Sequence, residues 1–514
     1  MKILHSAGIL YRPLAVTLAT AAALVMAALL LAGQASAGSK PKPGAPGLGD
    51  RLAPRLGNGG YDVTHYDLSL RYATSDPAQA IDGNESITAQ ATQPLSRFDL
   101  DFGGDSVGSV SVDGHQATFT RRGDELVITP SDWLRKGATF VVTIADFTAT
   151  PTEPTGGPAS TAFFITPDGS ATAPQPYYAH LVYPCNDHPR DKATFTVRFD
   201  VPAGTTAVAN GAETDHHTTG GRSYWTYEMT QPMATELTQL AVGNWDVATH
   251  DYDGITIRDV SPPSLTSFLQ PVFALEPSQL DFMQQQVGTY PFDLYGTFVV
   301  DTILGFALET QTISLYDIPW FTAYPQAVWD PVMTHELAHQ WFGDSVSPWT
   351  WSDVWLNEGH ATWYEYLYAE SVGELEDDTG FSTFDDLMQS VYSAGNQYRH
   401  DWGPVARPKY ADVYRLFNPN VYEGGALVLY ALRQQIGADA FQQVERMWVQ
   451  HYEGASASTD DFITLASQVS GQKLKSFLRA WLYGTKTPRM PGHPDWTVDP
   501  ATKSAAPPAR SPRF

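Results

Sequence analysis

Hydrophobic and polar residues alternate in short runs over about the first half of the chain. The alternating runs cover residues 61–72, 86–92, 125–129, 140–144 and 194–201. Turn-forming pairs separate such runs, at Asp82-Gly83, Asp113-Gly114, Gly156-Gly157 and Gly220-Gly221. Alternation with a period of two places one face of each strand on a core, and these pairs favour tight turns. The pattern therefore predicts an N-terminal all-β sandwich over residues 58–247.

The pattern changes after residue 247, where longer amphipathic stretches take over. Two strand-like runs, at residues 296–301 and 306–315, are followed by helical patterns. The helical patterns cover residues 327–342, 353–372, 423–436 and 474–482. Strands followed by a run of helices are typical of an α+β domain, so we predict a second domain of this class over residues 248–490.

Both ends of the chain differ in composition from these two domains. Residues 1–37 combine early basic residues with a long apolar run and end in Ala35-Ser36-Ala37, which is typical of a cleaved export signal. Because the apolar run is longer than in most signals, an uncleaved anchor is the alternative. Residues 38–57 are rich in Gly and Pro and predict a flexible linker, and residues 491–514 predict a poorly ordered tail. We expect a secreted protein with no stable membrane span after signal cleavage.

Composition supports an exported globular protein and excludes some partners. The 514 residues are too many for one core, and 43% of them are hydrophobic, which fits two or three folded domains. The net charge of −25 argues against nucleic acid or an anionic membrane as a partner, and it is compatible with a cationic ligand such as a peptide amine. Cys185 is the only cysteine, which excludes a disulfide within the chain and a cysteine-rich zinc site.

The segment HELAH, whose histidines are His335 and His339, has the H-E-x-x-H spacing of a zinc site. Asp330 and Pro331 predict the start of a helix that carries it. Residues four apart share one helix face, so both imidazoles could bind one zinc ion at about 2.0–2.1 Å. Glu336 lies off that axis and would act on a water molecule as general base. A buried histidine pair in a packed helix is the alternative interpretation.

A catalytic zinc site needs a third protein ligand and one open position. Glu358 is the best candidate, because a helix that starts at Ser352 or Asp353 could fold back along the first helix. Glu365 lies two turns beyond Glu358 on the same face, where it could hydrogen-bond a metal-binding histidine. Asp344 is the other candidate for that role. We expect one zinc ion, which would polarise a scissile carbonyl and acidify a water molecule.

These motifs resemble those of the gluzincin aminopeptidases, the family of aminopeptidase N and leukotriene A hydrolase. The family pattern is H-E-x-x-H, eighteen residues and then E, and it is met by His335, Glu336, His339 and Glu358. The flanking segments HELAHQWFGD and WLNEGHATWYEY are also similar to this family. The resemblance covers residues 61–496 and implies a thermolysin-like fold for the catalytic domain.

The resemblance also implies residues that bind the substrate. Segment 306–310, FALET, is similar to the family motif G-A-M-E-N. This similarity implies that Glu309 binds the free α-amine and that Ala307 contributes to substrate binding on the same strand. Tyr422 resembles the family tyrosine that stabilises the oxyanion, and Gln175 resembles a glutamine that helps to hold the amine. The first and last residues of FALET depart from the motif, which affects the expected S1 pocket and main-chain contacts.

The resemblance predicts a zinc metallo-aminopeptidase, a hydrolase that acts on peptides with a free N-terminal amine. A zinc endopeptidase, an epoxide hydrolase and a non-catalytic peptide-binding homologue are the alternatives. The family usually continues into a large helical C-terminal domain, whereas this sequence stops about where the catalytic domain should end. We therefore expect a secreted, bacterial-type short form with a more open cleft, and we expect it to be a monomer.

Overall fold

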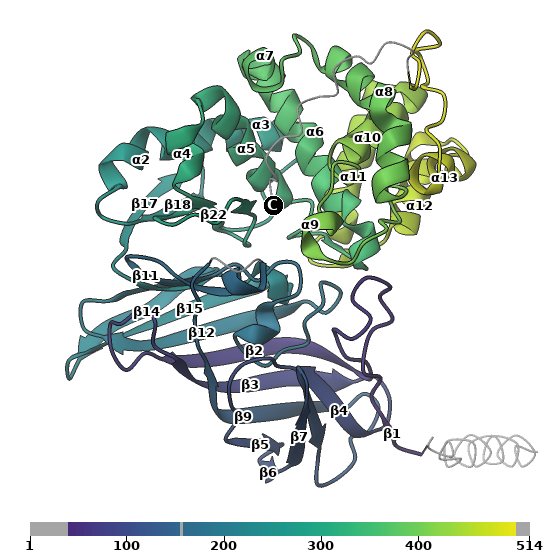
Figure 1. Ribbon diagram of the computed structural model, residues 1–514. Helices are drawn as coiled ribbons and strands as arrows, with labels where there is room; N and C mark the ends of the chain where they lie inside the picture. Colours follow the sequence, from purple (N-terminus) through teal and green to yellow (C-terminus); the bar gives the residue numbers. More distant parts are fainter. Residues whose placement is uncertain (1–39, 155–157, 500–514) are drawn as a thin grey trace, which may run out of the picture.

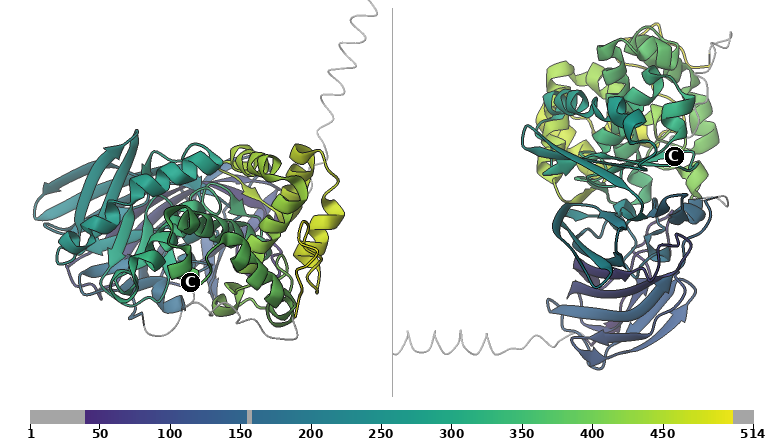
Figure 2. Two further views of the ribbon diagram at one scale, coloured as in Figure 1. Left: turned by 90° about the horizontal axis from the view of Figure 1, so that it is seen from above. Right: turned by 90° about the vertical axis from the view of Figure 1, so that its left-hand side faces the viewer.

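The computed structural model describes residues 40–154 and 158–499, which form two stacked domains (Figure 1). The N-terminal domain consists mainly of strands, and the second domain combines a small sheet with many helices. The side view in Figure 2 shows the same stacking. The predicted order, an all-β domain followed by an α+β domain, is confirmed.

Three sheets build the N-terminal domain. Its strands are β1 (Lys42–Pro43), β2 (Tyr61–Arg71), β3 (Ile81–Ala91), β4 (Leu95–Asp101), β5 (Ser109–Val112), β6 (His115–Gln116), β7 (Thr118–Arg122), β8 (Glu125–Thr129), β9 (Thr139–Ala149), β10 (Phe163–Ile165), β11 (Gly169–Thr172), β12 (Ala193–Pro202), β13 (Thr206–Ala209), β14 (Ala212–Thr219), β15 (Arg222–Met233) and β16 (Leu240–Gly243). The largest sheet has the order β14-β15-β12-β2-β3-β9-β5-β6. The two smaller sheets have the orders β10-β11-β16-β13 and β1-β4-β8-β7. Short 3-10 turns connect some strands, at η1 (Pro158–Thr161), η2 (Ala179–Leu181) and η3 (Thr235–Leu237).

The predicted strands of this domain are present, and alternation explains their orientation. In β2, for example, Tyr66 and Leu68 are buried in the core. The predicted turn at Asp82-Gly83 is wrong, because both residues lie inside β3. Gly83 serves packing there, since a Cβ at this position would come within 2.0 Å of the ring of Phe147.

Residues 40–57 pack against both domains, so the predicted flexible linker is wrong over this range. Strand β1 pairs in parallel with β4, and Leu52 and Ala53 are buried. Asp50 is also buried and accepts backbone hydrogen bonds from Leu52 and from Trp351 of the second domain. Arg51 adds a hydrogen bond to the carbonyl oxygen of Pro408 in the second domain, and these contacts hold the segment in place.

The second domain has one main sheet and a larger helical part. Its strands are β17 (Asp246–Tyr252), β18 (Ile255–Ser261), β19 (Leu294–Tyr295), β20 (Thr297–Val300), β21 (Ala307–Leu308), β22 (Ser314–Asp317), β23 (Ser347–Pro348) and β24 (Ser456–Ala457). Its helices are α2 (Thr266–Phe273), α3 (Glu276–Val287), α4 (Pro319–Ala323), α5 (Gln326–His339), α6 (Trp355–Val372), α7 (Leu375–Thr379), α8 (Phe384–Trp402), α9 (Val413–Leu416), α10 (Glu423–Ile436), α11 (Ala438–Tyr452), α12 (Thr459–Ser470) and α13 (Lys475–Tyr483), with a 3-10 turn η4 (Trp351–Asp353). The sheet order is β17-β18-β20-β22-β21, so β21 is an edge strand. In Figure 1 this sheet lies between the N-terminal domain and helices α2, α4 and α5.

Two elements of this domain differ from the sequence prediction. The run 306–315 is a short antiparallel hairpin of β21 and β22 instead of one strand, because the chain reverses through Thr312 at φ 70°. Helix α5 begins at Gln326, so Asp330 and Pro331 lie inside it and do not start it. The carboxylate of Asp330 instead accepts a 2.7 Å hydrogen bond from Gln279 of α3, which ties the two helices together.

The borders of the second domain also differ from the prediction. Strand β17 belongs to the second sheet and starts at Asp246, slightly before the predicted border at residue 247. The predicted poorly ordered tail is wrong for residues 491–499, where Trp496 stacks on Tyr430 with ring centroids 5.7 Å apart. The predicted signal, the Gly156-Gly157 turn and residues 500–514 lie outside the described residues. Within residues 40–154 and 158–499, no helix is both long and apolar enough to cross a bilayer.

Candidate metal centre and peptide site

Helices α5 and α6 bring three buried side chains together. His335 and His339 lie one turn apart on α5, and Glu358 lies in the first turn of α6. The Nε2 atoms of the two histidines are 3.4 and 3.5 Å from Oε2 of Glu358. Helix α6 starts at Trp355, a few residues later than predicted, because η4 precedes it and is capped by the Thr350 hydroxyl.

The geometry of this group fits a zinc ion. Two ligand atoms about 2.1 Å from one ion at a tetrahedral angle lie about 3.4 Å apart, which matches both Nε2–Oε2 distances. Oε2 of Glu358 is buried and has no hydrogen-bond partner within the described part of the chain, which is unfavourable unless a cation binds it. Burial raises the pKa of Glu358, but His339 and His335 outweigh this effect, and the pKa lies below its ordinary value. The carboxylate is therefore charged and able to act as a ligand.

A second cluster, formed by Glu309, Glu336 and His339, also places its polar atoms close together. It is a poorer metal site, because Glu309 approaches His339 through Nδ1, at 4.0 Å. That nitrogen already lies 3.1 Å from the carbonyl oxygen of Phe342. We therefore assign the metal to the group in which both Nε2 atoms face Glu358.

The Nδ1 atoms of the two histidines face acceptors on the side away from Glu358. Nδ1 of His335 lies 3.0 Å from Oε2 of Glu365, and Nδ1 of His339 faces the Phe342 carbonyl. An Nδ1 proton donated to these acceptors leaves each Nε2 lone pair available to a metal. Glu365 thus lies within hydrogen-bond distance of a histidine of the metal group. Asp344, the other candidate, is buried nearby, but no hydrogen bond joins its carboxylate to a described residue.

Glu336 is buried beside the metal group without belonging to it. Burial is the main reason that the pKa of Glu336 lies well above its ordinary value, and the carboxylates of Glu309, Glu358 and Glu365 add to the effect, while His339 opposes it. A bound dication would lower this pKa again, because it favours the charged form. This environment suits a group that takes up a proton and returns it.

Tyr422 immediately precedes helix α10, and its ring stacks on that of His335 with centroids 5.9 Å apart and planes 17° apart. Its position depends on the close crossing of α6 and α10. A Cβ at Gly359 would come within 2.9 Å of the backbone of Gly425, so the two helices approach at a pair of glycines. This crossing places the tyrosine beside the metal group.

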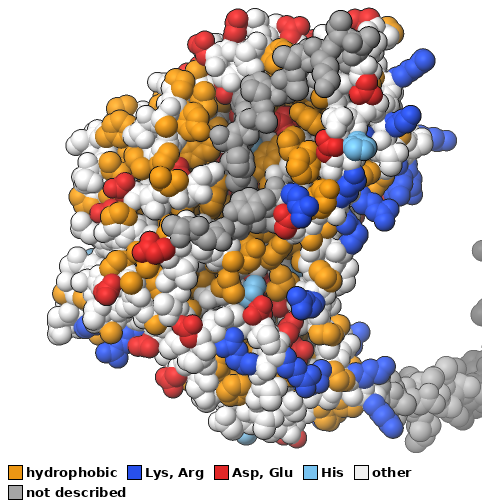
Figure 3. Space-filling model, viewed as in Figure 1, with side chains coloured by type: hydrophobic (Ala, Val, Ile, Leu, Met, Phe, Trp, Pro, Cys, Tyr) orange, Lys and Arg blue, Asp and Glu red, His pale blue; other side chains and the backbone are white. Residues whose placement is uncertain are grey.

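The predicted amine-binding residues meet at the border between the domains. Nε2 of Gln175, from the N-terminal domain, donates a 2.6 Å hydrogen bond to Oε1 of Glu309, which follows β21. Ala307 lies on β21 itself, the last strand in the order of this sheet, and no other described strand pairs with its outer edge. Figure 3 shows that the face where the domains meet is hollowed and lined largely by hydrophobic side chains. The structure therefore brings Gln175 and Glu309, the edge strand β21 and the metal group together.

Two ionisable residues near this site, one buried and one partly buried, carry no sequence signal. Burial raises the pKa of Glu236, in η3, well above its ordinary value, and Glu309 adds to the effect. Burial also lowers the pKa of Lys192 to about 7. Nζ of Lys192 donates to the backbone carbonyls of Asp344 and Ser345, at 2.5 and 2.9 Å. Neither residue sits in a motif with a characteristic spacing, so only the folded chain reveals them.

The fold and this site define a class of protein. Residues 63–237 match the peptidase M1 N-terminal domain, and residues 280–481 match the peptidase family M1 domain. The M1 zinc metallopeptidase of Deinococcus radiodurans shares 30% sequence identity with this chain and superposes with a TM-score of 0.73. The match covers 87% of this chain and 99% of that one. The chain belongs to peptidase family M1. This confirms the family that the sequence motifs indicated.

Individual relatives describe the similarity more closely. A mutant of the Deinococcus protein bound to a Tyr-Ser-Ala substrate superposes with a TM-score of 0.74 at 30% identity, over 87% of this chain and all of the other. Aminopeptidase M1 of Arabidopsis thaliana is 28% identical over 60% of this chain and 36% of its own length. Aminopeptidase N of Streptomyces lividans is 27% identical over 59% of this chain. This chain therefore spans only 36% of the length of these curated relatives.

Proposed function

We propose that the protein is a zinc aminopeptidase that hydrolyses the first peptide bond of peptides with a free N-terminal amine. The observation that carries the proposal is the pairing of Glu309 with Gln175 beside the metal group. Oε1 of Glu309 lies 2.6 Å from Nε2 of Gln175 and 4.0 Å from Nδ1 of His339. An ammonium group held by Glu309 would bring the adjacent peptide bond to the metal, which favours cleavage at the N-terminus.

The surrounding side chains can perform the steps of this reaction. When bound, zinc supplies a Lewis acid that polarises the scissile carbonyl and acidifies a water molecule. Glu336 takes a proton from the attacking water and transfers it to the leaving amine. Tyr422, stacked on His335, has a phenol hydroxyl that can donate a hydrogen bond to the developing oxyanion. The outer edge of β21, the last strand of its sheet and the strand of Ala307, can align the peptide through main-chain hydrogen bonds.

The Tyr-Ser-Ala ligand of the Deinococcus mutant supports peptides as the substrate class. The test compares the hydrolysis of matched tripeptides with free and with acetylated N-termini. Hydrolysis is measured as the release of the first amino acid. We expect cleavage of the free peptide only, because acetylation removes the charge that Glu309 recognises. Equal cleavage of both peptides would support an endopeptidase instead. Gln175→Ala is the matched variant, and we expect it to raise KM for the free peptide with little change in kcat.

We also propose that the protein is exported and acts as a monomer. The basic start, the apolar run and the small-residue site that ends at Ala37 support export through a cleaved signal. The test is N-terminal sequencing of protein recovered from the medium, which should begin at Gly38. Retention of the intact N-terminus in the membrane fraction would support an anchor. Analytical ultracentrifugation of the mature protein tests the oligomeric state, and we expect the mass of a single chain.

A further inference from the structure

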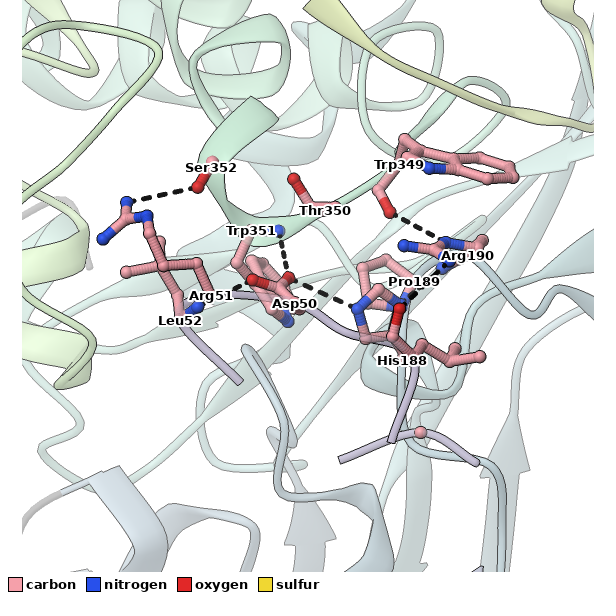
Figure 4. A network of polar contacts seen from close by, with 12 residues as sticks. Asp50, Arg51, Leu52, His188, Pro189, Arg190, Trp349, Thr350, Trp351 and Ser352 are labelled. Carbon is pink, nitrogen blue, oxygen red and sulfur yellow. Dashed lines mark hydrogen bonds and ion pairs between the residues drawn. The ribbon is translucent and has the colours of Figure 1, made fainter. Parts of the chain in front are cut away.

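A short segment before the first long strand lies between the two domains. We call residues 48–56 the N-terminal strap. Its Leu52 and Ala53 are buried, and Asp50 has only 1% of its surface exposed. Figure 4 shows Asp50 pointing toward His188 of the N-terminal domain and Trp351 of the second domain. The strap therefore contributes a buried carboxylate to the border between the domains.

Asp50 accepts hydrogen bonds on both carboxylate oxygens. Oδ1 accepts from the backbone N–H of Leu52 at 2.7 Å, and Oδ2 accepts from the backbone N–H of Trp351 at 2.7 Å. Oδ2 also lies 3.3 Å from Nε2 of His188. Burial raises the pKa of Asp50, but these hydrogen bonds outweigh it and hold the pKa below its ordinary value. Asp50 is therefore a charged acceptor whose contacts reach into both domains.

The contact between Asp50 and His188 does not need a charged imidazole. The backbone N–H of Arg190 donates to Nδ1 of His188 at 3.1 Å, so Nδ1 carries no proton and Nε2 donates to Asp50. A close approach of the chain supports this arrangement. Gly57, which directly follows the strap, has φ 67°, and a Cβ there would meet Cβ of His188 at 2.6 Å. The orientation of Asp50 is thus set by Leu52, His188 and Trp351 together.

The second-domain loop that Asp50 contacts leads directly into the helix of Glu358. Trp351 starts the turn η4, and α6 begins two residues after that turn. Nε of Arg190 donates to the carbonyl of Trp349 at 3.2 Å, and its guanidinium lies over the Trp349 ring. Arg51 of the strap donates to Oγ of Ser352 at 3.2 Å. The N-terminal domain and the strap therefore hold this loop at three residues, Trp349, Trp351 and Ser352.

The position of Glu358 depends on where this loop holds the start of α6. Its backbone N–H donates to the carbonyl of Val354, which directly follows η4. Both Nε2–Oε2 distances in the metal group are set by the Glu358 carboxylate. A shift of the loop would therefore move the carboxylate relative to the two histidines, which lie on a different helix.

We propose that Asp50 is a positioning residue for the zinc site, which fixes the start of α6 and so sets the placement of Glu358. The inference rests on the proposed zinc-dependent function. Without the Asp50 carboxylate, the N–H groups of Trp351 and His188 lose their acceptor, and the loop can move away from the strap. Groups that hydrogen-bond a metal ligand change metal affinity without touching the metal, and Asp50 would act one step further out, through the backbone that leads to Glu358.

The experiment measures the zinc dissociation constant by competition with a chromogenic chelator at neutral pH, together with kcat and KM. We expect Asp50→Ala to weaken zinc binding about 10-fold. We also expect kcat to fall while KM changes little, because Glu309 and Gln175 lie outside α6. Asp50→Asn should recover most of the affinity, since its carbonyl oxygen can replace Oδ2. The matched control is Asp191→Ala, which removes a buried carboxyl group that accepts the Val63 N–H at 3.0 Å within the N-terminal domain.

The control should lower the melting temperature yet leave zinc affinity unchanged. Asp50→Ala with wild-type zinc affinity and kcat below its melting temperature would overturn the inference, as would an equal loss of affinity in the control. If Asp50→Ala does not fold, Asp50→Glu provides the same test, because it keeps the charge but displaces the loop. Unchanged zinc affinity in this variant would also contradict the positioning role of Asp50. A wild-type protein that does not bind zinc would refute the proposed function itself, which separates the two failures.

Discussion

Each histidine of the metal group is oriented by a different kind of acceptor. Nδ1 of His335 faces the carboxylate of Glu365, whereas Nδ1 of His339 faces the main-chain carbonyl of Phe342. Such partners fix the imidazole tautomer and raise its basicity as a ligand. Glu336 lies between the histidines along the helix but outside the ligand group. We therefore propose different carboxylates for metal binding and for proton transfer.

This division of roles predicts that two conservative substitutions affect different quantities, one kcat and the other zinc affinity. We expect Glu336→Gln to bind zinc like the wild type but to lose about 10²–10⁴-fold in kcat, because its amide cannot accept a proton. Glu365→Gln should instead weaken zinc binding by about 10–100-fold. Chelator competition and steady-state kinetics on a free tripeptide distinguish the two. Retained turnover in Glu336→Gln would rule it out as the base.

Asp191 predicts a pH dependence of stability. Burial, with a contribution from Asp62, raises the pKa of Asp191 from 3.8 to about 8. Between these values the unfolded chain has released the proton that the folded chain keeps, so the free energy of unfolding falls as pH rises. In Asp191→Asn we expect the free energy of unfolding to fall less than in the wild type, with a difference of up to about 6 kcal/mol over this range. Urea unfolding of both proteins across this range checks this, and parallel pH profiles would contradict it.

At this scale, the sequence predicts residues whose spacing is fixed by one element. The positions of His335 and His339 follow from the helical repeat, and Glu358 follows from a second helix that folds back. Glu236 and Lys192 could not be predicted, because their roles depend on burial beside residues that are distant in sequence. The contact of Gln175 with Glu309 has the same cause, and only the family resemblance pointed to it.

At the scale of elements, alternation predicts strands well where one face is buried. Strand β8 has the predicted bounds, and β2 and β12 differ from their predicted ranges by single residues. Helices were harder to predict, and α3, for example, lies outside every predicted range. Its sequence EPSQLDFMQQQV has few apolar residues, so its periodic signal is weak. Its buried Glu276 and Gln279 instead hydrogen-bond other parts of the domain.

The glycine crossing of α6 and α10 yields a prediction about these two elements. Ala in place of Gly359 would gain about 1 kcal/mol in helix propensity. Overpacking costs about 1–3 kcal/mol, and the added Cβ would lie 2.9 Å from backbone that cannot rotate away. We therefore expect Gly359→Ala to lower the melting temperature and to reduce kcat, because α10 carries Tyr422 at its start.

The control for this substitution is Ser371→Ala, near the exposed end of α6. We expect it to leave both the melting temperature and kcat unchanged. Wild-type kcat in Gly359→Ala would show that the helices can separate without moving Tyr422, and the crossing would then serve stability alone.

At the scale of the whole molecule, the site depends on both domains. The second domain supplies the metal group and Glu309, the N-terminal domain supplies Gln175, and the strap contacts both domains through Asp50. The sequence predicted the two domains from their different periodicities. It did not predict the ordered strap, because Gly- and Pro-rich composition indicates a lack of regular structure and says nothing of tertiary contacts. The same reasoning explains the packed segment at residues 491–499.

Removal of zinc should destabilise the molecule, because the ligands come from two helices that only the folded chain brings together. A ligand that binds the folded state alone stabilises it by about 4 kcal/mol at a free concentration 1,000 times its Kd. We therefore expect a chelator to lower the melting temperature of the wild type and excess zinc to restore it, as measured by calorimetry. His335→Ala is the matched control, and its melting temperature should respond much less to chelator or zinc. An equal shift in the variant would show that the metal acts elsewhere, and no shift in the wild type would contradict a structural contribution of the ion. The two outcomes differ in meaning, since the first would question the site and the second only its coupling to folding.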